Sequence, residues 1–301
     1  MKSIFIDCNH QLAPVFAKVH RPDDPTIVVN THPFVSEDLP RLLDGYTVCL
    51  DDHSYMPTPL IAQCRSLRHI VFLGTGAASY MNVAELKEFG IAVHTIKGYG
   101  DTAVAEHTVA LMFAAARDLA RMDRTLRART WKPLEGIQLQ GKTLGLIGLG
   151  GIGREVARIA RGIGMNVIAY NRTRLTDAPV TLIDLDTLLA TSDIVSLHLT
   201  LGDETRGFLN AERIARMKKG AILVNTARGA LVDEQALLAA LKNGQIAHAA
   251  LDVYYAEPLA PDHPLIGLEN VTLSAHAAFR TLEASMTLLR RAIDIVAKIS
   301  A

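Results

Sequence analysis

Three segments of the sequence carry side chains that can grip a carboxylate and move a proton. Arg228 lies in NTARG, Glu257 in LDVYYAEP and His276 in LSAH, and each segment directly follows an apolar run typical of a buried strand. Arg228 could hold a substrate carboxylate through a bidentate fork and polarise an adjacent carbonyl. His276 could give or take the proton of an alcohol, with Glu257 holding the imidazole in one tautomer. The three residue types therefore form a coherent candidate site.

Each of these residues also has a structural interpretation. Arg228 could be a surface residue at a helix N-terminus, Glu257 a loop charge before Pro258, and His276 a hydrogen-bonded loop histidine. Their common position favours chemistry, because open α/β sheets bind ligands outside the carboxyl ends of their strands. The sequence therefore predicts that strand ends bring the three side chains to one edge of a sheet.

A glycine-rich turn stands between two apolar runs from Lys142 to Arg172, KTLGLIGLGGIGREVARIARGIGMNVIAYNR. Both runs read as strands, and the stretch after the turn has the apolar spacing of a helix. In the GxGxxG spacing, Gly148 permits a sharp bend, Gly150 lets the backbone approach a pyrophosphate, and Gly153 lets helix and strand pack closely. Glycine clusters also make ordinary loops, but the strand, turn, helix and strand together favour a dinucleotide site. The predicted contacts in the turn are Gly148, Gly150, Gly151, Ile152 and Gly153.

The end of the second strand predicts which dinucleotide binds. NAD sites usually place Asp or Glu there to accept a hydrogen bond from the ribose 2′-hydroxyl. This chain instead has Asn171, followed by Arg172, Thr173 and Arg174. A neutral residue followed by two cations suits a 2′-phosphate, although a solvated loop whose arginines face water is the alternative. The sequence therefore favours NADP(H), with NAD(H) as the other possibility.

Composition argues against several other classes of protein. The chain has 301 residues, of which 49% are hydrophobic, and its 31 basic and 31 acidic residues give a formal net charge of zero. Its charges form no long single-sign run, so nothing indicates a nucleic-acid or membrane partner. Cys8, Cys49 and Cys64 have neither CxxC nor zinc-ligand spacing, so no metal site is predicted. The sequence shows no signal-peptide pattern and no apolar run of membrane-spanning length, so the expected location is the cytoplasm.

The order of apolar runs predicts an α/β fold. Residues 1 to about 98 alternate short strands with helices, and Gly74-Thr75-Gly76 follows the fourth of these strands. The alternation of strands and helices resumes after the glycine turn, which indicates a parallel sheet. Asp101–Leu119 is rich in helix formers and apolar on several faces, so His107 within it reads as a packed core or interface residue. Residues 281–299 form a last helix with no strand after it, which could return to the first domain.

These motifs resemble the D-isomer-specific 2-hydroxyacid dehydrogenase family. The resemblance runs from about Ile70 to Ala284 and includes GTG, GYGDTAVAEHT, GLGGIGREVA, MKKGAILVNTARGALVDEQALLAAL, LDVYYAEPL and NVTLSAHAA. It implies two Rossmann-like, doubly wound parallel-sheet domains. A dinucleotide-binding domain (99–279) would be inserted in a flavodoxin-like substrate-binding domain (1–98 plus 280–301). It also implies a homodimer joined through the cofactor domains, to which the Asp101 helix and the basic segment Arg121–Lys132 would contribute.

The resemblance also implies a role for each matching position. The catalytic residues would be Arg228, Glu257 and His276. Cofactor contacts beyond the glycine turn would be Asn171, Thr226, Ala227, Arg228 and Asp252. The charges after Asn171 add the segment Arg172, Thr173 and Arg174, and His276 is also expected to contact the cofactor. The substrate would be held by the amides of Thr75 and Gly76 together with Arg228 and His276.

The chain departs from the family's usual pattern at three places. Residues 77–81 (AASYM) replace an acidic residue and an Asn or His, Asn171 replaces an acid, and Ala275 replaces the proline before the histidine. The predicted function is NAD(P)-dependent interconversion of a small 2-oxoacid and a D-2-hydroxyacid, with glyoxylate and hydroxypyruvate as candidate substrates. The alternative is a non-catalytic dinucleotide-sensing protein of the same fold, which the presence of all three catalytic residues disfavours.

Overall fold

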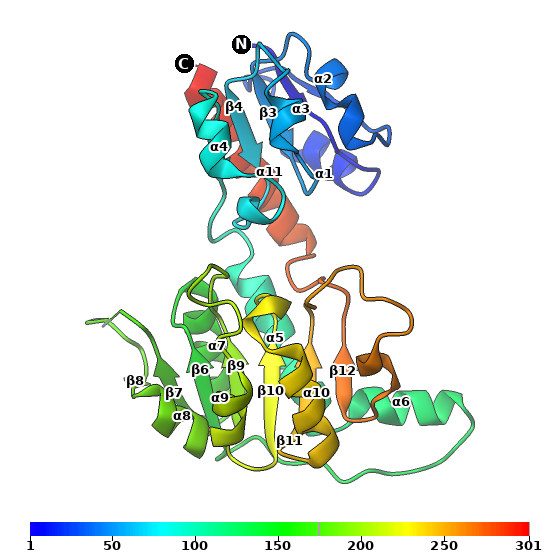
Figure 1. The fold of residues 1–301 in the computed structure, drawn as a ribbon, viewed down its shortest axis with the longest axis vertical. Helices are drawn as coiled ribbons and strands as arrows, with labels where there is room; N and C mark the ends of the chain where they lie inside the picture. The colour runs from blue at the N-terminus through cyan, green and yellow to red at the C-terminus, as the bar shows by residue number, and fades with distance from the viewer. Residues whose placement is uncertain (174, 301) are drawn as a thin grey trace. The chain divides into compact units, whose positions relative to one another are not determined.

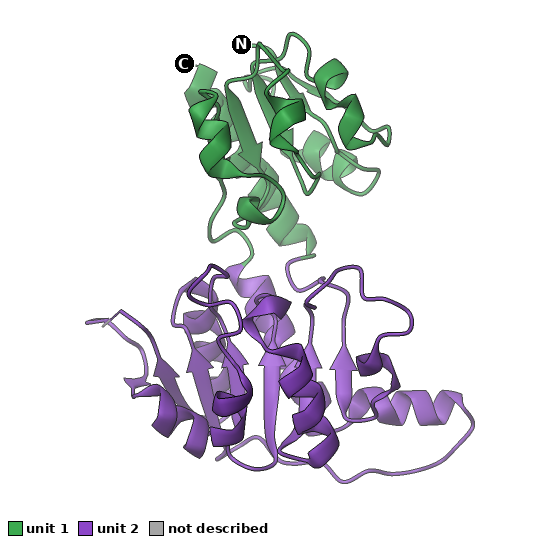
Figure 2. Cartoon of the chain, viewed as in Figure 1, with its two compact units in different colours: residues 1–100, 280–301 green, residues 101–279 purple. Residues whose placement is uncertain are grey.

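The computed structural model of the protein, which describes residues 1–173 and 175–300, consists of two compact units (Figures 1 and 2). Unit 1 comprises Met1–Gly100 and Arg280–Ala301, and unit 2 comprises Asp101–Phe279. The chain leaves unit 1, forms the whole of unit 2 and then returns, so unit 2 is inserted in the sequence of unit 1.

Unit 1 is built on a parallel sheet in the order β2-β1-β3-β4-β5. Its strands are β1 (Ser3–Phe5), β2 (Ile27–Val29), β3 (Val48–Asp51), β4 (His69–Phe72) and β5 (Ala92–Thr95). Its α-helices are α1 (Leu12–Val19), α2 (Leu39–Leu42), α3 (Thr58–Ile61), α4 (Val83–Glu88) and α11 (Leu282–Ser300). The last helix, α11, buries Leu289 and Ile293 in the same core as Phe5 and Leu50 of the sheet. Apolar burial thus draws the C-terminal helix back to the sheet formed by the N-terminal segment.

Unit 2 is built on a seven-stranded parallel sheet in the order β12-β11-β10-β9-β6-β7-β8. Its strands are β6 (Thr143–Ile147), β7 (Asn166–Tyr170), β8 (Thr181–Leu182), β9 (Ile194–Leu197), β10 (Ala221–Asn225), β11 (Ile246–Leu251) and β12 (Val271–Leu273). Its α-helices are α5 (Asp101–Ala116), α6 (Leu119–Arg127), α7 (Gly151–Gly162), α8 (Leu185–Thr191), α9 (Ala211–Arg216) and α10 (Glu234–Asn243). The strand order reverses between β6 and β9, the position where open α/β sheets bind ligands.

The seven-stranded sheet is covered on both faces because its strands are apolar on both sides. On one face, Leu144 and Leu146 of β6 share a core with helices α5 and α7. On the other face, Ile147 of β6 packs with residues of α8, α9 and α10, including Leu188 and Leu241. The predicted α/β fold with two doubly wound parallel sheets is confirmed.

One local prediction, the end of a helix, was wrong. The helix predicted over Asp101–Leu119 ends at Ala116, whose carbonyl oxygen accepts a 2.8 Å hydrogen bond from the Ile137 N–H. Asp118 then takes a left-handed conformation, with φ 53°, and α6 begins directly after it. Asp tolerates this conformation better than most residues. Helix α1 contains Pro14, but this residue lies in the first helical turn, where the missing N–H costs no hydrogen bond.

Within residues 1–173 and 175–300, no helix is both long and apolar enough to cross a bilayer. Within the same residues, no group of three or more His, Cys, Asp or Glu side chains is arranged to hold a metal ion.

Candidate active site

Three neighbouring strands deliver the predicted catalytic residues to one edge of the unit 2 sheet. Arg228 follows β10, Glu257 follows β11 and His276 follows β12, and these strands are adjacent and parallel. The loops after them are joined through main-chain groups. The Asp252 N–H donates to the Asn225 carbonyl at 3.0 Å, and the His276 N–H donates to the Asp252 carbonyl at 2.7 Å.

Gly229 shows how closely two of these loops approach. A Cβ placed there would lie 1.9 Å from the carbonyl carbon of Tyr254 and 2.0 Å from its oxygen. Backbone cannot move aside as a flexible side chain can, so a larger residue would push the loop of Arg228 away from the loop of Glu257. The glycine after Arg228 is therefore required by packing between the two loops.

His276 and Glu257 form a hydrogen-bonded pair. The imidazole Nδ1 lies 2.6 Å from Glu257 Oε2, and the other carboxylate oxygen accepts the Tyr254 N–H at 2.8 Å. Both side chains remain about one-third exposed, at 31% and 33%. With Nδ1 engaged by the carboxylate, Nε2 is the ring nitrogen left to exchange a proton.

The electrostatics of this pair favour an ionised carboxylate. Burial alone raises the pKa of Glu257, but the hydrogen bonds from His276 and from the Tyr254 N–H outweigh that effect. The positive charges of His276 and Arg228 also favour the ionised carboxylate. The pKa of Glu257 therefore lies below its ordinary value. Arg228 thus lies within electrostatic range of the pair, although it comes from a different strand.

His276 itself occupies a left-handed backbone conformation, with φ 48°. Such a conformation costs roughly 1–3 kcal/mol in a non-glycine residue and persists only where surrounding contacts impose it. Its N–H bond to the Asp252 carbonyl is one such contact. The ring also meets Phe279 edge-on, with centroids 6.3 Å apart.

Arg228 extends from a loop shaped by a buried asparagine. The Asn225 Oδ1 accepts the Ala227 N–H at 3.0 Å, and the Asn225 Nδ2 donates to the Arg228 carbonyl at 2.9 Å. The guanidinium donates to the Ala227 carbonyl at 2.6 Å through Nη1. A guanidinium has five N–H donors, so this bond leaves others for a carboxylate.

Asp252 forms hydrogen bonds along the loop after β12, which carries His276. Its carboxylate is fully buried and accepts hydrogen bonds from the Ser274 hydroxyl at 2.6 Å and from the amides of Ala277 and Ala278 at 2.9 Å each. Burial opposes its ionisation, but these donors and His107 lower the Asp252 pKa to about 2. The residue was expected to contact the cofactor; here its side-chain oxygens bind the loop that carries His276.

The glycine turn has the geometry that a pyrophosphate site requires. Gly148 has φ 99°, and a Cβ there would lie 2.4 Å from the His198 carbonyl oxygen. A Cβ on Gly153 would lie 2.4 Å from the Gly148 carbonyl oxygen, and one on Gly151 would lie 1.9 Å from Asp101 Oδ2. Gly150 is different, because a Cβ there would meet no protein atom within 4 Å. Open space over Gly150 beside the N-terminus of α7 fits a dinucleotide pyrophosphate.

In the segment predicted to select the cofactor, Asn171 is hydrogen-bonded to the main chain, whereas Arg172 makes an exposed ion pair. Asn171 accepts the Leu149 N–H of the glycine turn at 3.1 Å and donates to the Thr173 carbonyl at 2.6 Å. Arg172 forms an ion pair with Glu204, and both side chains are more than three-quarters exposed. Arg174, the second predicted cation, lies outside the described residues.

The remaining predicted contacts lie in three different places. Thr226 is buried in the loop of Arg228, and its hydroxyl lies 2.8 Å from that of Thr108 in α5; Ala227 follows it. Ile152 is half-buried in the first turn of α7. Thr75 and Gly76 follow β4 in unit 1, with Thr75 exposed. Their roles stay predictions.

Two histidines with polar contacts were missed by the sequence reasoning. His198 directly follows β9 at the point where strand order reverses, its Nε2 lies 2.9 Å from Ser196 Oγ, and burial lowers its pKa to about 4. Its position after a strand could have marked it. His107 was assigned to packing, but its Nε2 lies 3.0 Å from Ser274 Oγ and 3.5 Å from Asp252 Oδ1. No local pattern signals that contact.

The chain is similar to known proteins over most of its length. The family model described as "D-isomer specific 2-hydroxyacid dehydrogenase, NAD binding domain" matches residues 109–278. The chain therefore belongs to the D-isomer specific 2-hydroxyacid dehydrogenase family. Its class is that of the NAD(P)-dependent oxidoreductases that interconvert 2-hydroxyacids and 2-oxoacids.

Several individual proteins are similar to this chain. The chain is 42% identical to a hydroxypyruvate reductase of Thermotoga maritima over 80% of this chain and 79% of that protein. It is 41% identical to a glyoxylate reductase of Aeropyrum pernix, over 78% and 74%. It is also 39% identical to a D-3-phosphoglycerate dehydrogenase of Archaeoglobus fulgidus over 83% of this chain, but spans only about half of that relative, 49%. Among solved structures, an acyclic imino acid reductase (Bsp5) in complex with NADPH and D-Arg superposes with a TM-score of 0.85 at 29% identity, covering 100% of this chain and 97% of that one.

Proposed function

We propose that the protein reduces small 2-oxoacids to D-2-hydroxyacids, with hydroxypyruvate and glyoxylate as its substrates. The observation that carries this proposal is the His276–Glu257 pair at 2.6 Å, within electrostatic range of Arg228 at the same sheet edge. The similarity to a hydroxypyruvate reductase and a glyoxylate reductase supports the choice of substrates.

Each residue of this set has one role. Arg228 binds the substrate carboxylate through a fork of N–H donors and thereby orients the neighbouring carbonyl. Protonated His276 gives the proton from Nε2 to the carbonyl oxygen, and Glu257 stabilises the imidazolium and fixes its orientation. A nicotinamide cofactor, when bound, supplies the hydride that reaches C2. Oxidation of the hydroxyacid reverses these roles, with neutral His276 as the base.

The cofactor proposed for this reaction is NADP(H). Its pyrophosphate would lie over Gly150 at the N-terminus of α7, and Arg172 would turn from Glu204 to the 2′-phosphate. Support comes from the neutral Asn171 at the end of β7 and from the similarity to a reductase whose structure contains NADPH. We assign cofactor binding to unit 2, and the amides of Thr75 and Gly76 in unit 1 would contribute to substrate binding.

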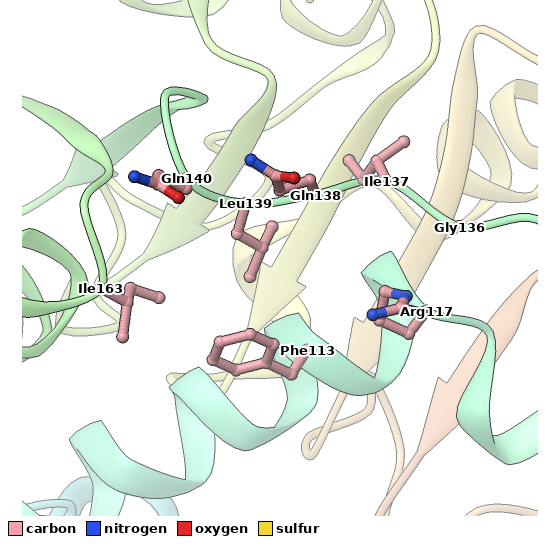
Figure 3. A pocket seen from close by; sticks show the side chains of 8 residues that line it. All are labelled: Phe113, Arg117, Gly136, Ile137, Gln138, Leu139, Gln140 and Ile163. Carbon is pink, nitrogen blue, oxygen red and sulfur yellow. The ribbon is translucent and has the colours of Figure 1, made fainter.

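We also propose that two copies of the chain associate through unit 2. Large apolar side chains are exposed along the end of α5, α6 and the segment that follows: Phe113, Leu119, Leu126, Trp131 and Ile137. A hollow of about 460 Å³ lies in the same region, and Figure 3 shows Phe113, Leu139 and Ile163 around it. An exposed apolar surface of this kind favours association. Sedimentation should give a dimer, and Phe113→Glu together with Trp131→Glu should give a monomer.

A panel of 2-oxoacids assayed with NADH and NADPH in parallel tests the proposed function. We expect oxidation of NADPH with hydroxypyruvate and glyoxylate, faster than oxidation of NADH at equal concentration. Binding of the dinucleotide with no turnover of any 2-oxoacid would instead indicate a dinucleotide sensor. Chiral analysis of the product should give the D-hydroxyacid when a substrate with a stereogenic product is used.

A further inference from the structure

We propose that His107 of α5 is a positioning residue for the proton donor. It acts through Ser274 and Asp252 to hold the loop on which His276 is carried. The proposal rests on the proposed function of His276, but the arrangement of the loop can be tested with or without turnover.

The direction of each hydrogen bond follows from the chemistry of the groups. Asp252 is ionised, so it can only accept, and the single hydroxyl hydrogen of Ser274 is donated to its Oδ1 at 2.6 Å. Ser274 Oγ must therefore accept from His107 Nε2, which lies 3.0 Å away. This contact places a hydrogen on Nε2 of His107. The donor chain thus runs from His107 to Ser274 to Asp252.

Asp252 links this chain of hydrogen bonds to the main chain around His276. Its carboxylate accepts the amides of Ala277 and Ala278, the two residues after the catalytic histidine, and its carbonyl accepts the amide of His276 itself. Three consecutive N–H groups are therefore fixed by one buried aspartate. The residue before His276 is Ala275, which has no ring to restrict its own backbone. Hydrogen bonds therefore carry more of the task of keeping the strained φ of 48° at His276.

The residue next to His107 holds the other catalytic loop. Thr108 donates its hydroxyl hydrogen to the Val104 carbonyl at 2.7 Å, so Thr226 must be the donor in the 2.8 Å contact between the Thr108 and Thr226 hydroxyls. Thr226 lies two residues before Arg228. Consecutive residues of α5 thus anchor the arginine loop and the histidine loop of the same sheet edge.

A pair of substitutions separates hydrogen bonding from packing. His107→Phe keeps a ring but removes the donor, whereas His107→Gln places an amide N–H near the position of Nε2. We expect kcat for 2-oxoacid reduction to fall by about 10- to 100-fold in His107→Phe, the range that follows from misplacing a reacting group by about 1 Å. His107→Gln should recover most of this loss, and the Kd for NADPH should change by less than about twofold in both.

A second measurement does not depend on turnover. Amide hydrogen exchange over residues 274–278 should accelerate in His107→Phe and in Ser274→Ala, and should stay close to wild type in His107→Gln. The double variant should behave like either single variant, because the two residues act in one chain of hydrogen bonds.

The outcomes distinguish this proposal from the proposed function. A wild-type protein that reduces no 2-oxoacid would overturn the function, while faster exchange over residues 274–278 in His107→Phe would still support the positioning role. Unchanged exchange and unchanged kcat in His107→Phe would overturn the positioning role, as would equal losses in the Phe and Gln variants. Additive effects in the double variant would also contradict it.

Discussion

The loop that carries His276 and the loop that follows β7 lie in the same unit but are built in opposite ways. In the first, Asp252 is fully buried and its oxygens accept from Ser274 and two main-chain amides. In the second, Arg172 is exposed and paired with an equally exposed Glu204. The groups proposed to exchange a proton are preorganised by buried contacts, whereas the group proposed to select the cofactor is held by one surface ion pair. Substitutions should therefore have large effects on the reaction at the first loop and small, selective effects at the second.

Removal of the proton donor should give the largest effect. His276→Ala is expected to lower kcat for 2-oxoacid reduction by about 10²- to 10⁴-fold, the range typical of a general acid. An unchanged kcat in His276→Ala would contradict this assignment. His263→Gln is a matched control, since His263 pairs with Glu234 in the same unit at 3.1 Å.

Loss of the Arg228 guanidinium should have the second-largest effect on the reaction. Arg228→Gln keeps a polar side chain but shortens it and removes the charge and the fork, so kcat/KM for the 2-oxoacid should fall by about 10- to 100-fold. Cofactor affinity should change far less. A comparable loss of dinucleotide affinity would show that Arg228 serves the cofactor rather than the substrate carboxylate.

Asp252 should affect stability in a pH-dependent way. Its pKa is lowered to about 2 from an ordinary value of 3.8, so its ionised form is favoured by folding and contributes about 2 kcal/mol above pH 4. This contribution is lost as pH falls from about 4 toward 2, because the carboxylate then protonates in the native state. Denaturant unfolding at pH 7 should show Asp252→Asn to be less stable, with a smaller difference near pH 3. A difference independent of pH would argue against the ionised carboxylate as the cause.

The exposed ion pair after β7 should give the smallest effect and the most selective one. Arg172→Gln is expected to raise KM for NADPH by roughly fivefold, equivalent to about 1 kcal/mol, and to leave KM for NADH nearly unchanged. Glu204→Gln is the matched variant, because it frees Arg172 and should lower KM for NADPH slightly. Equal changes with both dinucleotides would show that Arg172 does not contact the 2′-phosphate.

Much of the fold could be predicted because its signals are local. The apolar run before the segment that carries Arg228 forms β10, Ala221–Asn225, and β6, the glycine turn and α7 follow the predicted order of strand, turn and helix. The errors occur where tertiary contacts decide. Helix α5 ends at Ala116, where a distant segment supplies the Ile137 N–H, and no periodicity in the sequence encodes that bond.

In the candidate site too, some features follow from local sequence signals and others from tertiary contacts. Arg228, Glu257 and His276 were identified from residue type and from their place after apolar runs, because parallel strands bring their carboxyl ends to one edge. The role of Asp252 within the histidine loop and the contact of His107 with Ser274 were not predicted. His107 and Ser274 are 167 positions apart in the chain, and hydrogen bonds over such a separation exist only after the helix has packed on the sheet.

The sequence by itself determined the parallel α/β architecture, the glycine turn and the identities of the residues that can do chemistry, since these depend on apolar periodicity and on side-chain type. Only the tertiary structure decided which hydrogen-bond donors satisfy the buried Asp252, where the main chain of His276 is held and how closely Gly229 meets the neighbouring loop. The physical reason is that a buried charge must be matched by donors from whatever elements packing brings beside it, and that set is fixed by the whole fold.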